Sequence, residues 1–122
     1  MPRPIELYLR DILDAIIKVE SYALGLSQEQ LENDTAKQDA ILFNLIVIGE
    51  AAKQVPDDRR VELADIEWRK IAGFRDIVVH QYFRVNLIIV WDIIQNHLPP
   101  LKRTIEDFLQ NNTDSESDNP HE

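Results

Sequence analysis

The segment Ile41–Ile48 limits what this chain can fold into more than any other stretch. Every one of its positions except Asn44 is apolar, so a helix through it is hydrophobic on almost every side. A helix of that kind is buried on more than one face. We therefore expect a helix over residues 34–55, capped by Asp34 or Thr35, that is either central to a small bundle or also faces a second subunit.

The remaining apolar residues recur mostly at three-and-four spacing, the pattern of amphipathic helices. No stretch shows the alternation of a strand, and the polar segments 27–33 and 57–64 are expected to be connectors with at most a turn of helix. A length of 122 residues suits one domain with one core. The sequence thus predicts an all-α fold, an antiparallel bundle of four to five helices, with these further helices: Ile5–Ala23, Asp65–Phe83, Asn86–Leu98 and Leu101–Leu109.

Glycine and proline residues mark several expected boundaries. Gly25 predicts the end of the first helix, and Pro99 and Pro100 predict a break or kink between the last two. Gly73 lies inside an expected helix, where it costs about 1 kcal/mol relative to alanine, so we expect it to serve close packing. Residues 111–122 are acidic and contain no apolar side chain, which predicts a disordered tail after a helical domain over residues 1–110.

The net charge of −9 argues against a general nucleic-acid binder. The charge is unevenly distributed, because residues 53–84 carry seven basic and six acidic side chains whereas the flanking segments are strongly acidic. An anionic substrate is therefore held most easily in that segment. The chain has no cysteine, no apolar run long enough to span a bilayer and no signal-peptide pattern, so we expect a cytoplasmic protein without membrane contact.

The same segment contains a cluster of chemically capable side chains, Arg75, Asp76, His80 and Tyr82. Asp76 and His80 are four residues apart, so on a helix they share a face and can hydrogen-bond. A carboxylate on one imidazole nitrogen fixes the tautomer and raises the basicity of the other. An arginine can hold a phosphate and stabilise the charge that develops on it. These are the parts for metal-independent RNA cleavage, in which the 2′-hydroxyl attacks the adjacent phosphate.

Arg75 and His80 do not point the same way on an ideal helix, because a five-residue spacing places them roughly 140° apart. Either the helix ends or distorts near His80, or the site is a groove where two copies of the chain meet, which predicts a homodimer. Simpler interpretations stay open. Asp76 and His80 can be a satisfied polar pair, Tyr82 a core residue and Arg75 a surface ion-pair partner.

Three further titratable residues need an interpretation. Glu50 is an acid on the apolar helix. It can form an ion pair with Lys53 at the helix end, or it can hold the Arg75 side chain in position without itself contacting the substrate. His97 is expected at a helix end, where it is favourable to the helix dipole, and His121 lies in the tail without an assigned role. The histidines show no ligand spacing, so the sequence predicts neither a metal site nor a cofactor.

The cluster and its flanks resemble the HEPN superfamily and, within it, the HepT-like proteins. The hallmark there is an arginine, four residues, a histidine, one residue and a tyrosine, with a polar residue after the arginine. Arg75, Asp76, His80 and Tyr82 match this pattern without departure. The resemblance extends over about residues 5–109, and the flanking stretches that contribute to it are Ile48–Lys53, Trp68–Phe74 and Val90–Asn96.

The resemblance implies a homodimeric, metal-independent ribonuclease toxin of a type VII-like toxin–antitoxin pair, acting on transfer RNA or messenger RNA. Arg75 and His80 would form the nuclease site, with support from Asp76. The cognate antitoxin would be a minimal nucleotidyltransferase of the MntA type that transfers AMP to Tyr82. The alternatives are a non-catalytic helical subunit that presents substrate to a nucleotidyltransferase, and an interaction module without catalysis.

Overall fold

The computed structural model describes residues 3–81 and 84–117, with side chains through residue 111. Every regular element in these ranges is helical, which confirms the expected all-α class. None of these helices combines the length and the apolarity needed to cross a bilayer. The elements in chain order are α1 (Ile5–Ala23), α2 (Gln28–Glu32), α3 (Thr35–Gln54), α4 (Asp57–Arg60), η1 (Val61–Leu63), α5 (Trp68–His80), α6 (Leu87–Asp92), η3 (Ile93–His97) and α7 (Leu98–Ser117).

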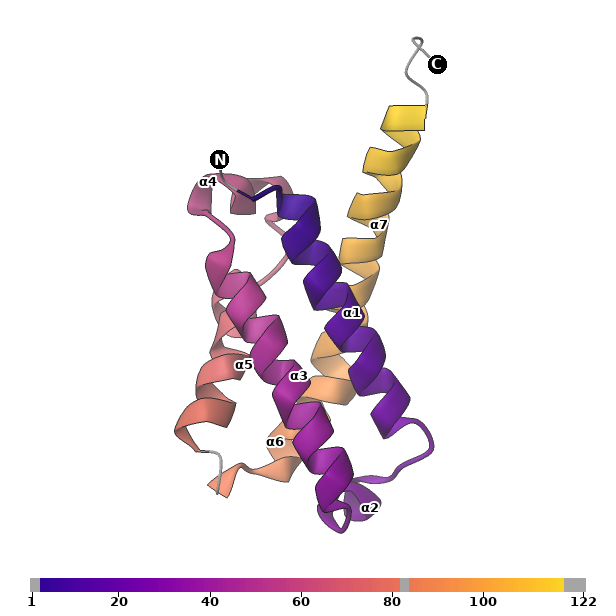
Figure 1. Ribbon diagram of the computed structural model, residues 1–122, viewed down its shortest axis with the longest axis vertical. Helices are drawn as coiled ribbons and strands as arrows, with labels where there is room; N and C mark the ends of the chain where they lie inside the picture. The colour runs from indigo at the N-terminus through magenta and orange to yellow at the C-terminus, as the bar shows by residue number, and fades with distance from the viewer. Residues whose placement is uncertain (1–2, 82–83, 118–122) are drawn as a thin grey trace.

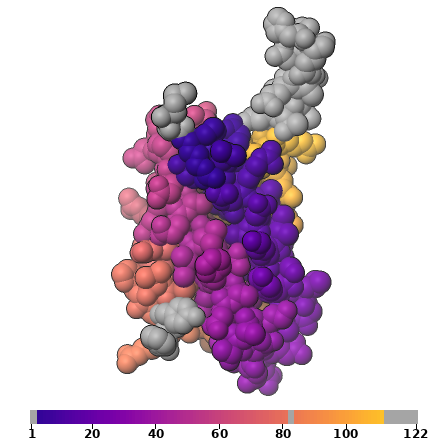
Figure 2. All heavy atoms as spheres, in the orientation of Figure 1, coloured from indigo at the N-terminus to yellow at the C-terminus, as the bar shows by residue number. Residues whose placement is uncertain are grey.

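Helix α3 is central, as its apolar sequence predicts (Figure 1). It runs antiparallel to α1 and packs against α1 on one side and α5 on the other, while α7 lies beside α1. Figure 2 shows α1 and α3 filling one broad face of the molecule. Burial of the apolar faces of these helices provides the main driving force for the fold. The core side chains with almost no exposed surface include Leu9, Ile12, Ile16, Val19, Ile41, Leu45, Ile48, Phe74, Val78, Leu98 and Ile105.

The predicted helix boundaries hold where a capping residue fixes them. The Asp34 side chain accepts a hydrogen bond of 3.0 Å from the backbone N–H of Lys37 and so caps α3. Asn86 caps α6 in the same way, at 2.9 Å from the backbone nitrogen of Ile88. Gly25 has a φ of +77° just after α1, the left-handed conformation that ends many helices. Local sequence is therefore sufficient to place these helix ends.

Of the break or kink expected at Pro99 and Pro100, the break is absent from the structure. Helical backbone continues from α6 through the π-helical segment η3 into α7, and the backbone N–H of Leu98 bonds to the carbonyl of Ile93. A proline ring clashes with the carbonyl four residues earlier and lacks an N–H. The wider π turn accommodates both defects before the regular helix resumes, so the two expected helices form one continuous helical stretch.

Two other boundaries differ from expectation. Helix α5 begins at Trp68 rather than Asp65, where the indole nitrogen of Trp68 donates to the carbonyl of Leu63 at 3.1 Å. Helix α7 continues to Ser117, so the backbone of residues 111–117 is helical, and residues 118–122 lie outside the described ranges. The division into a domain over residues 1–110 and a tail stays a prediction.

Candidate active site on helices α3 and α5

Four charged side chains of alternating sign connect α3 to α5. Arg75 Nε lies 2.6 Å from Glu50 Oε1, and Arg75 Nη1 lies 3.3 Å from Asp76 Oδ1. The same Asp76 oxygen accepts a 2.9 Å hydrogen bond from Lys53 Nζ. Glu50 thus pairs with Arg75 rather than with Lys53, and Arg75 is an ion-pair partner of two carboxylates, as the simpler interpretation of this residue expects. These four residues, Glu50, Lys53, Arg75 and Asp76, are called the charge chain below.

Gly49 brings the two helices together at the charge chain. A Cβ added to Gly49 would lie 2.5 Å from Arg75 Cβ and 2.6 Å from the Arg75 backbone nitrogen. Only a residue without a side chain permits this approach. Gly73, which was expected to serve close packing, has nothing within 4 Å of such a Cβ, so that expectation was wrong. The sequence signal that marks Gly49 is its position directly before Glu50 in the most apolar helix.

The charge chain lowers the pKa of Asp76. The hydrogen bond from Lys53 is the main cause; partial loss of hydration opposes it, and the hydrogen bond from Arg75 adds to it. The Asp76 carboxylate is thus ionised at neutral and mildly acidic pH. A carboxylate with a lowered pKa stabilises the fold above its ordinary pKa, and that contribution is lost as the pH falls through the lowered value. Asp76 is therefore an anion that holds Arg75 in place, not a proton donor.

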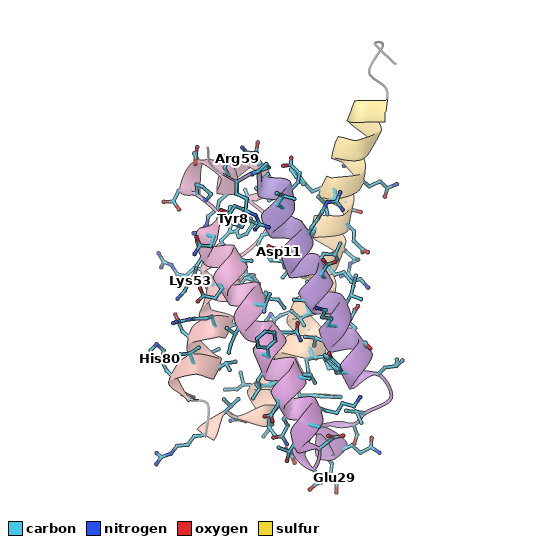
Figure 3. All side chains as sticks on the ribbon, in the orientation of Figure 1. Tyr8, Asp11, Glu29, Lys53, Arg59 and His80 are labelled. Carbon is cyan, nitrogen blue, oxygen red and sulfur yellow. The ribbon has the colours of Figure 1, made fainter. Side chains whose placement is uncertain are left out.

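His80 stands apart from the charge chain. It is the last residue of α5, it is exposed, and its ring makes no hydrogen bond or ion pair with any described residue. The Asp76–His80 hydrogen bond suggested by their spacing is absent, and Asp76 Oδ1 instead accepts from Lys53 and Arg75. Figure 3 places His80 and Lys53 at the same edge of the molecule. Among the described residues, no side chain therefore holds the His80 imidazole in a fixed position.

The angular difference between Arg75 and His80 that their spacing predicts persists in the structure, because both residues lie within the regular helix α5. Helix α5 is regular from Trp68 and ends at His80, after which Gln81 leaves helical geometry with a φ of −127°. Tyr82, the fourth residue of the sequence cluster, lies outside the described residues. A groove formed with a second copy of the chain, the other possibility that the spacing raised, belongs to the proposal below.

A second acid–histidine pair, outside the charge chain, joins the end of α6 to the end of η3. Asp92 Oδ2 is 3.1 Å from His97 Nε2, and Asn96 donates to Asp92 Oδ1 at 2.6 Å. The bond from Asn96 and then that from His97 lower the pKa of Asp92. His97 is thus inside a continuous helix rather than at the helix end expected from sequence. It also lines a cavity of about 170 Å³ beside α5 and α7, which does not include the charge chain.

Among the residues from 3 to 81 and from 84 onward that can be described, no three acidic or histidine side chains gather as a metal site requires. The described part therefore offers an arginine fixed by carboxylates and an unencumbered histidine, on one helix of an all-α bundle. Arginine side chains bind phosphate and histidine side chains transfer protons in many proteins. The described residues therefore include one side chain of each kind on α5 of an all-α protein.

Comparison with known proteins identifies the family. The model for the family described as "Ribonuclease HepT-like" matches residues 12–108, so the chain belongs to this family. "Putative RNase TTE0752" of Caldanaerobacter subterraneus subsp. tengcongensis is 35% identical, over 89% of this chain and 95% of that relative. "Probable ribonuclease HepT" of Thermococcus cleftensis is 34% identical, over 87% of this chain and 96% of the relative. No solved structure matches the chain.

Proposed function

We propose that the chain is a metal-independent endoribonuclease and the toxin of a toxin–antitoxin pair. The observation that carries this proposal is the combination of a carboxylate-held Arg75 with an exposed His80 that has no partner among the described residues, on the same helix of a HepT-like bundle. The names of its relatives support RNA as the substrate. The residues match the chemistry of RNA cleavage by the substrate's own hydroxyl.

In the proposed reaction the 2′-oxygen of the RNA forms a bond to the adjacent phosphorus, and the bond from phosphorus to the 5′-oxygen breaks. His80 accepts the proton of the 2′-hydroxyl, and a protonated imidazole returns one to the departing 5′-oxygen. The products are a 2′,3′-cyclic phosphate and a 5′-hydroxyl. Arg75 stabilises the added negative charge on the crowded phosphate. Glu50 and Asp76 bind Nε and Nη1, and among the described residues nothing bonds to Nη2, which can therefore bind the phosphate.

The test is cleavage of cellular RNA by the purified protein in the presence of a metal chelator. Expression in cells without the antitoxin should arrest growth, and sequencing the new RNA ends should identify the target. A protein that binds RNA without cutting it, and whose expression is harmless, would instead favour a substrate-presenting subunit of a nucleotidyltransferase. Substitution of Arg75 and of His80 by alanine then tests whether the cleavage takes place at this site.

We also propose that the active form is a homodimer. On α3, Phe43 leaves 64% of its surface exposed, and it lies on the same helical stripe as Glu50, two turns away. On α5, Val79 is 42% exposed directly before His80. Exposed apolar side chains beside a polar site mark surfaces for association. A second copy packed on this face would cover Phe43 and Val79, and would bring a second set of site residues to the groove.

The dimer makes a prediction for Phe43. Light scattering at micromolar concentration should report two chains for the wild type and one chain for Phe43→Glu, because a charge at the centre of an apolar interface is costly to bury. Leu24→Glu is the matched control, since Leu24 is 84% exposed at the end of α1, away from α5. A dimer that survives Phe43→Glu would exclude this face as the interface.

Control by an antitoxin is the last part of the proposal. The partner would be a nucleotidyltransferase of the MntA type, and the acceptor Tyr82, two residues after His80. The phenol oxygen would attack the α-phosphorus of ATP, pyrophosphate would leave, and the phenolic proton would pass to a base of the partner. The added phosphate could bind Arg75 through two hydrogen bonds and so occupy the position of the RNA phosphate.

Mass spectrometry of the protein co-expressed with its antitoxin tests this control. We expect AMP on a peptide that contains Tyr82 and its complete loss in Tyr82→Phe, which should stay toxic. Peptides with Tyr8 and Tyr22 are internal controls, because both tyrosines lie on α1 and should be unmodified. A silenced protein without any AMP would contradict the proposal and indicate inhibition by simple binding.

A further inference from the structure

Lys53 is the member of the charge chain that neither the motif nor the proposed mechanism explains. It comes from α3, whereas Arg75 and Asp76 come from α5, and its Nζ lies 2.9 Å from the Asp76 oxygen that Arg75 Nη1 also contacts at 3.3 Å. The two cations are therefore close neighbours on either side of one carboxylate oxygen. The Lys53 side chain is 37% exposed and lies at the edge of the molecule where His80 lies (Figure 3).

We propose that Lys53 is a substrate-contacting residue and that it forms, together with Arg75, a two-cation site for the phosphates of the RNA backbone. This inference rests on the proposed ribonuclease function. A lysine ammonium has three donors, and Asp76 takes one of them. Arg75 Nη2 makes no hydrogen bond to any described residue. Donors from two helices are thus free at one edge of the molecule, where a backbone phosphate can meet both.

The charge balance of the site supports this role. Without Lys53, the carboxylates of Glu50 and Asp76 would outnumber the single positive charge of Arg75, and the charge chain would repel a phosphate. With Lys53 the chain is neutral, and both cations present unused donors. This additional positive charge is important in an acidic protein, because the net charge of −9 repels a polyanion such as RNA. Lys53 therefore makes the arginine of an acidic protein accessible to RNA.

A competing interpretation is that Lys53 only holds Asp76 in place. The two interpretations differ in how binding responds to salt. Each phosphate contact to a single strand releases counterions and steepens the dependence of log affinity on log salt by about 0.7. A lysine that contacts phosphate contributes to this slope, whereas one that only positions Asp76 does not. Salt dependence therefore separates a substrate contact from a structural ion pair.

The experiment compares Lys53→Gln with Lys102→Gln. Lys102 is a matched control, because it forms an equally short ion pair, 2.8 Å from Glu20, and contacts no member of the charge chain. RNA binding is measured in an inactive His80→Ala background, and cleavage in the active one. We expect Lys53→Gln to weaken binding and kcat/KM on the order of tenfold, to act mainly on KM, and to flatten the salt slope by about 0.7. Lys53→Arg should restore most of the affinity and most of the salt slope, since it keeps the positive charge.

The outcomes distinguish this inference from the proposed function itself. If the wild type does not cleave RNA, the ribonuclease assignment fails, whatever Lys53 does. If the wild type cleaves and Lys53→Gln shows the affinity and salt slope of Lys102→Gln, the two-cation site is wrong. A variant that loses activity with an unchanged salt slope would also overturn the inference and make Lys53 a positioning residue. Equal unfolding midpoints for the two glutamine variants would show that folding is not the cause.

Discussion

Replacing His80 by alanine should lower the rate of RNA cleavage by about 10²–10⁴-fold, the usual contribution of one general acid–base group. The fold should be unaffected, because His80 is exposed at the end of α5 and its ring contacts no described partner. Stability should change by less than about 0.5 kcal/mol, as for most surface substitutions. A large loss of activity at constant stability would assign the proton transfer to this imidazole.

Arg75→Ala should cause a loss of similar size through a different route. It removes the group that stabilises charge on the phosphate, and it leaves the two carboxylates of Glu50 and Asp76 with Lys53 as the single cation of the charge chain at the point where RNA must approach. Cleavage of cellular RNA with a chelator present is the common assay for both variants. His97→Ala is the control, because His97 is a partnered histidine remote from the charge chain. Undiminished cleavage by His80→Ala would end the assignment of the reaction to this site.

The parts of the fold that the sequence predicts well are those decided by neighbouring residues. The bounds of α1, the cap of α3 at Asp34 and the cap of α6 at Asn86 all follow from periodicity and capping chemistry within a few residues. The central position of α3 follows from its apolar surface alone. By contrast, Pro99 was misjudged because the π turn that accommodates it is formed by the segment before it, which no local rule anticipates.

In the candidate site, too, some features follow from local sequence and others do not. The spacing from Arg75 to His80 is visible in the sequence, but the partners of these residues are set by the packing of α3 on α5. Local spacing favoured an Asp76–His80 pair, whereas Lys53, 23 residues away along the chain, takes the carboxylate. The ammonium of a lysine is a strong, charge-assisted partner for a carboxylate. Contacts between helices therefore decide which members of a sequence motif are coupled.

The close approach at Gly49 is a second such contact, and it leads to a large expected effect. In Gly49→Ala the new methyl group would lie 2.5 Å from Arg75 Cβ and 2.6 Å from the Arg75 backbone nitrogen. Carbon atoms normally approach to about 3.5–4.0 Å, so α3 and α5 must separate by roughly 1 Å. We expect a destabilisation of about 1–3 kcal/mol, because a backbone atom cannot rotate away as a flexible side chain can.

Activity should fall further than stability in this variant. The displaced atoms belong to Arg75 itself, and Glu50, which fixes the arginine at 2.6 Å, is the next residue after the substitution. A misplacement of about 1 Å at a reacting group can cost about 10²-fold in rate. Urea unfolding and RNA cleavage, measured on the same preparation at a temperature where the variant is folded, separate the two effects.

Gly73→Ala is the control that isolates the steric effect from helix propensity. Both glycines lie within helices, so both substitutions gain up to about 1 kcal/mol of intrinsic helix stability. Only at Gly49 does the methyl group meet the other helix; at Gly73 nothing lies within 4 Å. We therefore expect Gly73→Ala to be at least as stable as the wild type and fully active. If Gly49→Ala matched it in both measurements, Arg75 would not depend on the close contact of α3 with α5, and the charge chain would have to be positioned by its ion pairs alone.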